Sequence, residues 1–238
     1  MKTQIHKANS RGHANHGWLD THHSFSFASW YNPERMHFGM LRVLNDDVVA
    51  GGKGFGTHPH ENMEIISIPL SGDLEHKDSM GTTSVIREND IQVMSAGTGV
   101  LHSEYNKNPD KEVNFLQIWI FPKIKNIAPR YDQKSYNPDD SLNKVLRLVS
   151  PLEDVSDSVK INQDAYISLT TLEGNSEINY KMNQEDNGVY ALLLEGDAVI
   201  GGNSLAVKDA TGISETDSFS VKTQSKAKVL FIEVPMSR

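Results

Sequence analysis

The chain has 238 residues, a formal net charge of −8 and no cysteine. A chain of this length can bury a large core as one big domain or as two smaller ones. The acidic balance argues against unaided nucleic-acid binding, which needs a basic surface, and the lack of cysteine excludes disulfides and leaves a bound metal only nitrogen and oxygen donors.

The first residues, 1–7, are polar and lack the apolar core of a signal peptide. No segment has the roughly twenty consecutive apolar residues that a membrane-spanning helix needs. We therefore expect a cytoplasmic protein that does not contact a membrane.

The first half of the chain alternates short apolar runs with turn residues. Residues 24–27 alternate polar and apolar side chains and predict a half-buried strand, and residues 40–44 predict a strand that ends in a turn at 45–47. Further strands are expected at 63–70, 74–78, 82–86, 91–94 and 115–121. Strands spaced roughly eight to twelve residues apart predict a barrel or a sandwich.

Residues 123–145 change in character and predict a connector, so we divide the chain into domains at 1–125 and 126–238. In the second half, strands are expected at 146–149, 165–171, 177–181, 190–194, 198–200, 219–221 and 229–234. Glu195-Gly196-Asp197 follows an apolar strand, as Ser71-Gly72-Asp73 does in the first half. This correspondence suggests an internal duplication, and the whole pattern predicts an all-β fold with little helix.

Two pairs of polar residues stand out in the first half. His58 and His60 are two residues apart, and so are His102 and Glu104. Side chains at i and i+2 lie on the same face of a strand, so each pair can point the same way. Three imidazoles and one carboxylate around one point suit a divalent metal ion, and glycine-rich turns at 51–56 and 97–99 would place the histidines at strand starts near a barrel mouth. The alternative is that the four side chains are satisfied by hydrogen bonds inside the barrel.

The other histidines are weaker candidates. His22 and His23 are adjacent, so they face opposite sides of a strand and cannot form a same-face pair, and we expect His76 to be structural or at the surface. All ten histidines lie at or before His102, so only the first half can hold a histidine-based metal site.

These motifs resemble those of known proteins. The pattern from Gly52 through His58 and His60 to Glu64 resembles the first cupin motif, although the glycine expected after it comes one residue late, at Gly72. The run from Gly97 to His102 resembles the second cupin motif, with Ala96 and Gly97 where a proline-led turn is usual. More narrowly, three segments resemble the pirin family: His58-Pro59-His60, the stretch from Ala96 to Glu104, and the segment 23–28.

The resemblance implies two antiparallel cupin barrels of the double-stranded β-helix, or jelly-roll, type with metal only in the first. It implies His58, His60, His102 and Glu104 as the ligands, whereas Glu64 would not be a ligand and is held as a candidate neighbour of the site or as a core or rim residue. The implied metal is most often Fe(II), but the donor set equally suits Zn, Mn, Co, Ni or Cu.

The resemblance also implies a quercetin 2,3-dioxygenase-like activity, in which a flavonol-type substrate reacts with O2. Glu104 would then be both a ligand and the base that takes the proton of the substrate hydroxyl. A second hypothesis is a pirin-like, metal-dependent regulatory module that binds a protein partner and has no physiological catalysis. A third is a cupin isomerase or hydrolase that uses Zn as a Lewis acid.

Overall fold

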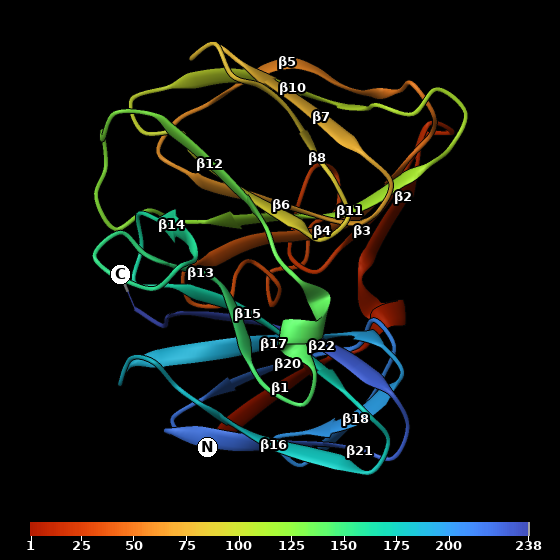
Figure 1. Ribbon diagram of the computed structural model, residues 1–238, viewed down its shortest axis with the longest axis vertical. Helices are drawn as coiled ribbons and strands as arrows, with labels where there is room; N and C mark the ends of the chain where they lie inside the picture. Colours follow the sequence, from red (N-terminus) through yellow and green to blue (C-terminus); the bar gives the residue numbers. More distant parts are fainter. Residues whose placement is uncertain (238) are drawn as a thin grey trace.

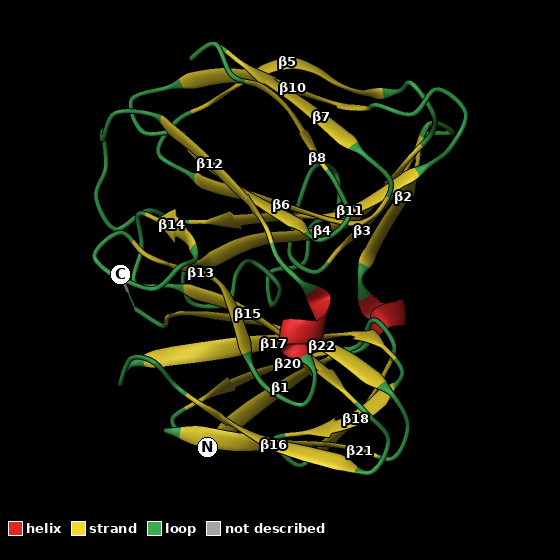
Figure 2. Ribbon diagram, viewed as in Figure 1, coloured by secondary structure: helices red, strands yellow, loops and turns green. Residues whose placement is uncertain are grey.

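The computed structural model describes residues 1–237 and is built almost entirely of β-strands (Figures 1 and 2). In that range the helices are two short 3-10 turns, η1 (Ala8–Ser10) and η2 (Pro138–Ser141), and there is no α-helix. The predicted all-β class is therefore confirmed. None of the helices in the described part of the chain is long and apolar enough to cross a membrane.

Two lobes stack along the long axis of the molecule, and each consists of a larger and a smaller antiparallel sheet (Figure 1). In the N-terminal lobe, the seven strands of the larger sheet are, in spatial order, β12 (Arg130–Ser135), β9 (Asp90–Ser95), β6 (Glu64–Ser71), β11 (Val113–Ile120), β4 (Leu41–Val49), β3 (Leu19–His23) and β2 (Gly12–Asn15). The smaller sheet contains β5 (Gly54–His60), β10 (Val100–Asn106), β7 (Leu74–Asp78) and β8 (Thr83–Ile86).

The C-terminal lobe has the same two-sheet plan. Its seven-stranded sheet has the order β1 (Lys2–His6), β20 (Ala210–Ser214), β17 (Asn187–Glu195), β22 (Ala227–Pro235), β15 (Tyr166–Leu172), β13 (Leu146–Pro151) and β14 (Val159–Ile161), of which the last pair is parallel. Its smaller sheet contains β16 (Ser176–Lys181), β21 (Ser218–Thr223), β18 (Asp197–Ile200) and β19 (Asn203–Ala206).

The two strand orders correspond position by position, which agrees with the expected duplication. β9, β6, β11 and β4 follow one another in the first lobe as β20, β17, β22 and β15 do in the second. The turn after the second of these strands contains Gly72 in one lobe and Gly196 in the other, with φ angles of 78° and 77°. A positive φ of this size favours glycine, so the shared turn is encoded locally.

Two strands cross the predicted division at residue 125. β1 precedes the division in sequence but pairs with β20 of the second lobe. β12 follows the division but pairs with β9 of the first lobe (Figure 1). Each lobe thus receives its outermost strand from the other side of the boundary. The residues at 123–145 are therefore not a plain connector, because they contain β12.

Two further predictions of local structure were wrong. Residues 24–27 do not form a regular strand, because the strand here is β3 and ends at His23. The polar run 45–47 is not a turn but the buried middle of β4. Its side chains find hydrogen-bond partners across the sheet, for example Asn45 with His23 and Asp47 with Thr21, so polarity alone was misleading there.

The two larger sheets face each other and share one apolar core. Buried side chains from both lobes belong to it, among them Ile66 and Ile118 from the first and Ile167 and Ile232 from the second. Removing apolar area from water stabilises the folded state by about 25 cal/mol for each Å² that is buried. This shared layer fixes one lobe against the other and leaves the smaller sheets at the two outer ends of the molecule (Figure 2).

Candidate metal centre

The four predicted ligands come from two neighbouring strands of the small N-terminal sheet. His58 and His60 lie at the end of β5, and His102 and Glu104 lie in β10. In the antiparallel register, His102 is directly opposite His58, and an irregularity follows before Glu104. The expected position of His58 and His60 at a strand start is wrong, because β5 begins at Gly54, but their expected shared face is observed.

The three imidazoles converge. Their ring centroids are 4.5 Å apart for His58 and His102 and 4.8 Å apart for the other two pairs, and one nitrogen of each ring lies within 4.8 Å of the others. His58 donates its Nδ1–H to the carbonyl of Gly56 at 2.7 Å, which leaves its Nε2 lone pair free. Such a hydrogen bond at the second nitrogen is the usual support of a metal-binding imidazole.

His102 provides the observation that tests whether these residues fit a metal. Its side chain is buried, and its Nε2 has no hydrogen-bond partner among the described residues. Burial lowers the pKa of His102 to about 3 and that of His60 to about 4, so both rings are neutral at physiological pH and carry a free lone pair. A buried unpaired nitrogen is costly unless a ligand satisfies it, so the three imidazoles fit a divalent cation.

The Glu104 side chain reaches the larger sheet of the lobe, where Ser67 on β6 and Gln117 on β11 hold its carboxylate. It is buried, accepts a hydrogen bond from Ser67 Oγ at 3.0 Å and another from Gln117 Nε2 at 2.8 Å. Its carboxylate oxygen groups with nitrogens of His76 and His102 rather than with those of His58 and His60. The structure therefore brings three of the four predicted ligands into one group and connects the fourth to that group through His102.

Glu64 does not belong to this group. It lies at the start of β6, where it accepts hydrogen bonds from Ser95 Oγ at 2.7 Å and from the backbone N–H of Asn162, in the second lobe, at 3.2 Å. Burial raises its pKa. Of the two roles left open for Glu64, the structure agrees with that of a buried core residue, although residues 58, 60, 62 and 64 would share one face of a continuous strand. Parity is lost because residues 61–63 turn the chain from β5 into a strand of the other sheet.

His76 is the site residue that sequence reasoning missed. It is fully buried on β7, its Nε2 is 2.9 Å from Asp78 Oδ2, and its Nδ1 is 3.5 Å from Nδ1 of His102. The available signal was the pair His76-x-Asp78, which repeats the i, i+2 spacing of the other two pairs. Nothing in the sequence indicated that β7 pairs with β10.

An aromatic cavity of about 290 Å³ is lined by Trp119, which contacts His60, but by none of the histidines themselves. The ring of Trp119 packs edge-on against His60, with centroids 4.9 Å apart, and against Phe27, with centroids 5.4 Å apart. Trp30, Tyr31 and Met36 also line this cavity. It offers an apolar surface for a planar aromatic ligand on the side of Trp119 where Phe27 lies.

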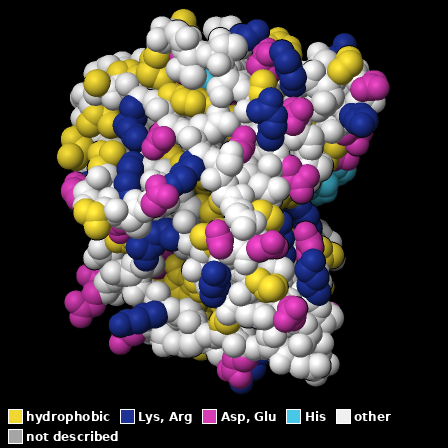
Figure 3. All heavy atoms as spheres, viewed as in Figure 1, with side chains coloured by type: hydrophobic (Ala, Val, Ile, Leu, Met, Phe, Trp, Pro, Cys, Tyr) yellow, Lys and Arg dark blue, Asp and Glu magenta, His cyan; other side chains and the backbone are white. Residues whose placement is uncertain are grey.

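A second histidine group lies at the surface. His13 Nε2 is 2.8 Å from Asp20 Oδ1, and the rings of His13 and His22 stack with centroids 4.5 Å apart. Figure 3 shows histidine side chains on the flank where β2 and β3 lie. His23 points the other way and is buried, which agrees with the predicted opposite orientation of the adjacent pair.

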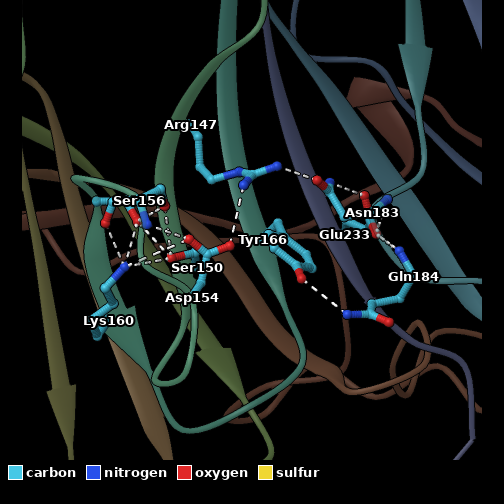
Figure 4. Close-up of polar contacts among 10 residues, drawn as sticks. Arg147, Ser150, Asp154, Ser156, Lys160, Tyr166, Asn183, Gln184 and Glu233 are labelled. Atoms are coloured by element: carbon cyan, nitrogen blue, oxygen red, sulfur yellow. Dashed lines mark hydrogen bonds and ion pairs between the residues drawn. The ribbon is translucent and has the colours of Figure 1, made fainter.

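The C-terminal lobe carries one histidine, His6 on β1, whose Nδ1 is 2.9 Å from the Tyr190 hydroxyl and which belongs to no group of potential metal ligands among the described residues. The other main polar side chains of this lobe pair with one another (Figure 4). Glu233 is fully buried and accepts hydrogen bonds from the Tyr180 hydroxyl, the Asn183 side chain and the Gln184 backbone. Arg147 lies over the Tyr166 ring, 4.9 Å from its centroid, and donates to Asp154. These side chains satisfy one another and do not form a group with metal-ligand geometry.

The comparisons with known proteins agree with this description. A sequence profile described as Pirin matches residues 4–120, and one described as Quercetinase C-terminal cupin domain matches residues 148–234. The quercetin 2,3-dioxygenase of Escherichia coli O157:H7 is 40% identical over 97% of this chain and 98% of its own length. A pirin-like protein of Caulobacter vibrioides is 36% identical over 93% of this chain and 95% of its own.

Solved structures give the same result. The bacterial pirin YhhW of Escherichia coli, determined in complex with nickel(II), superposes with a TM-score of 0.92 and 38% identity, covering 98% of this chain and 99% of its own. The predicted pair of cupin jelly-roll units is thereby confirmed. With the fold, the full-length identity and the histidine group in agreement, the chain belongs to the pirin family of bicupin proteins.

Proposed function

We propose that this protein is a metal-dependent dioxygenase that opens flavonol-type substrates, as the name quercetin 2,3-dioxygenase of its relatives implies. The observation that carries the proposal is the unpaired, buried Nε2 of His102 beside two further imidazoles. His6 also has a buried Nε2 without a partner among the described residues, but it belongs to no group of potential ligands, so the convergence of three imidazoles is what distinguishes His102.

We propose His58, His60 and His102 as the core ligands and Glu104 as the fourth. A three-histidine set leaves coordination positions for a substrate, which distinguishes a catalytic site from a closed structural one. The proposed ion is Fe(II), with Zn, Mn, Co, Ni or Cu as alternatives that the nitrogen and oxygen donors also accept. In this proposal the N-terminal half, residues 1–125, carries all the ligands and residues 126–238 none.

When bound, the metal would lower the pKa of a coordinated hydroxyl and make the substrate electron-rich toward O2. Glu104 would take the proton from the substrate hydroxyl at one of its carboxylate oxygens. Ser67 and Gln117 hold that carboxylate by one hydrogen bond to each oxygen, and because a carboxylate accepts up to about four hydrogen bonds, both oxygens keep accepting capacity. A base held in this way is oriented before the substrate arrives.

The aromatic cavity would bind the flat ring system of the substrate. Trp119 connects it to the ligand set, because its ring contacts His60 on one side and Phe27 on the other. Packing of a planar ligand against these rings would exclude water from the reacting oxygens.

The test combines metal content with turnover. Protein purified without added metal is subjected to elemental analysis, alongside the His60→Ala variant, and quercetin-dependent O2 uptake and carbon monoxide release are measured for both. We expect a metal in the parent that is reduced or absent in the variant, together with O2 uptake that only the parent supports.

A metal-loaded parent that consumes no O2 with quercetin would overturn the dioxygenase proposal and would favour the metal-dependent regulatory module. Zinc as the only metal would weaken it in favour of Lewis-acid chemistry. The cytoplasmic location stays a prediction.

A further inference from the structure

Three buried polar side chains, those of Asp78, His76 and His102, follow one another into the proposed metal centre. Asp78 and His76 lie on β7, and the register with β10 places Asp78 opposite His102 and His76 opposite Glu104. The side chains of Asp78 and His76 are both 0% exposed. Their order is Asp78 Oδ2 to His76 Nε2 at 2.9 Å, then His76 Nδ1 to His102 Nδ1 at 3.5 Å.

Asp78 sets which atom donates and which accepts along this series of hydrogen bonds. Its Oδ1 accepts the backbone N–H groups of Met80 and Thr82 at 2.9 and 3.0 Å. Burial raises the pKa of Asp78, but the hydrogen bonds from His76, Thr82 and Met80 outweigh burial and hold that pKa below its ordinary value. Asp78 is therefore an acceptor at both oxygens, and His76 must present Nε2–H to it.

The remaining hydrogen positions follow from this start. A neutral His76 with its hydrogen on Nε2 has a lone pair on Nδ1. That lone pair faces Nδ1 of His102, and the two nitrogens can interact only if His102 carries its hydrogen on Nδ1. Nε2 of His102 is then the unprotonated nitrogen, and it is the buried atom without a partner in the described structure.

We propose that Asp78 and His76 are positioning residues, which hold His102 in the Nδ1–H form so that its Nε2 lone pair faces His58 and His60 as a metal ligand. This inference rests on the metal centre proposed above. Tyr131, contributed by β12, packs against the His76 ring with centroids 4.8 Å apart and keeps it in place. Outer residues of this kind orient metal-binding histidines, and their loss typically weakens metal affinity about 10- to 100-fold.

A competing role for His76 is that of a ligand, because its nitrogen groups with those of His102 and Glu104. The observed contacts oppose that role. Nε2 of His76 is taken by Asp78, and its Nδ1 points to another nitrogen rather than into an open space between donors.

The Asp78→Asn variant reverses the chain with a change of one atom. The two backbone N–H groups of Met80 and Thr82 require the amide oxygen on their side, so the amide NH2 must face His76. His76 then accepts at Nε2 and donates from Nδ1, and His102 is driven to the Nε2–H form, which cannot bind a metal through that nitrogen.

The first measurement needs no metal. ¹⁵N NMR of the histidine rings in the metal-free protein reports which nitrogen of His102 carries the hydrogen. We expect Nδ1–H in the parent and a shift toward Nε2–H in Asp78→Asn. An unchanged tautomer in the variant would overturn the inference, whatever the protein does with metals.

The second measurement is the affinity for Ni(II) by calorimetry, in a His13→Ala background that removes the surface group. We expect affinity 10- to 100-fold weaker for Asp78→Asn and unchanged within about twofold for Asp209→Asn. Asp209 is a matched control in the other lobe, since it also accepts two backbone N–H groups and one side chain. Equal affinity of Asp78→Asn and the parent would overturn the inference.

A pair of variants separates positioning from ligation and from packing. His76→Asn keeps an acceptor near the place of Nδ1, whereas His76→Leu removes it. If His76 only positions His102, the Asn variant retains Ni(II) affinity within about threefold and the Leu variant does not. Equal, complete loss in both folded variants, with unchanged thermal unfolding, would identify His76 as a ligand and overturn the inference.

A further variant shows whether the proposed metal centre itself is wrong, independently of the role of Asp78 and His76. If His58→Ala in the same background binds Ni(II) as the parent does, the proposed centre is wrong. The NMR comparison of Asp78→Asn then still decides whether the chain sets the tautomer of His102.

Discussion

The two lobes share a strand order but differ in what they place inside. In the small N-terminal sheet, β5 and β10 turn His58, His60 and His102 inward, whereas the corresponding strands β16 and β21 contribute Tyr180 and Phe219 to an apolar cluster. Both lobes form, so the fold depends on strand pairing and on the shared core between the large sheets. The inward residues of the small sheet are free to become either a core or a site.

The difference has an energetic side. The N-terminal lobe buries a polar layer that includes His23, Asn45, Asp47 and Gln117, whose groups must be paired to avoid a desolvation cost. In the C-terminal lobe, side chains such as Phe231 and Val229 form an apolar cluster, which stabilises the fold without needing hydrogen-bond partners, although the buried Glu233 does need them. We therefore expect the first lobe to carry function and the second to carry more of the stability, and the following experiments test that contrast.

The largest contrast is expected between two buried carboxylates. Glu104→Gln should lower turnover by about 10²- to 10⁴-fold, because it removes the base, while Ni(II) affinity falls less than turnover. Glu233→Gln, in the other lobe, should leave turnover unchanged and lower the free energy of unfolding by about 1–3 kcal/mol, because it disturbs saturated hydrogen bonds. Kinetics, calorimetry and urea unfolding measure the three quantities. Equal loss of turnover and metal affinity in Glu104→Gln would reject the base role.

The apolar interior of the C-terminal lobe should respond through stability alone. Phe231 is fully buried, and its ring lies 4.6 Å from that of Tyr180. Phe231→Ala should lower the free energy of unfolding by about 3–5 kcal/mol and leave Ni(II) affinity unchanged. Val207→Ala, at a half-exposed position in the same lobe, should change it by less than about 0.5 kcal/mol. A loss of metal affinity in the folded Phe231→Ala protein would contradict the separation of roles.

The polar interior of the first lobe should be visible in the pH dependence of stability. Burial raises the pKa of Asp47 from 3.8 to about 7, and the charges of Glu104 and Asp46 add to this. Because its pKa is raised on folding, the folded state binds the proton more tightly, so its contribution falls as pH rises from about 4 to about 7. Relative to Asp47→Asn, the parent should lose at most about 4 kcal/mol over that range, at about 1.36 kcal/mol per pH unit. Parallel curves for the two proteins in urea unfolding would show that Asp47 titrates normally.

The last expected effect is the stabilisation of the folded protein by metal. A cation that binds only the folded protein raises the free energy of unfolding by about 2.7 kcal/mol when its concentration is one hundred times Kd. In the His13→Ala background, Ni(II) should raise the melting temperature of the parent but not that of His60→Ala. An equal rise in both proteins would place the bound ion outside the three-histidine group.

Sequence reasoning recovered most of the strands and the histidines, and its errors share a cause. The spacing of His58 with His60 predicts a common face because neighbouring residues in a strand obey a fixed period. Glu64 shows the limit of that rule, because the period ends where the chain turns into another sheet. The run 45–47 was mistaken for a turn because its polar residues are satisfied only by strands distant in sequence.

The sequence by itself determined the all-β class, the repeated turns at Gly72 and Gly196, and the restriction of any histidine site to the first half, because composition, backbone conformation and side-chain alternation are local properties. Only the tertiary structure decided that β1 and β12 exchange lobes, that Glu64 joins the lobes, and that His76 stands behind His102. Those facts depend on which strands pair, and pairing between segments far apart in the chain is decided by the packing of the whole molecule.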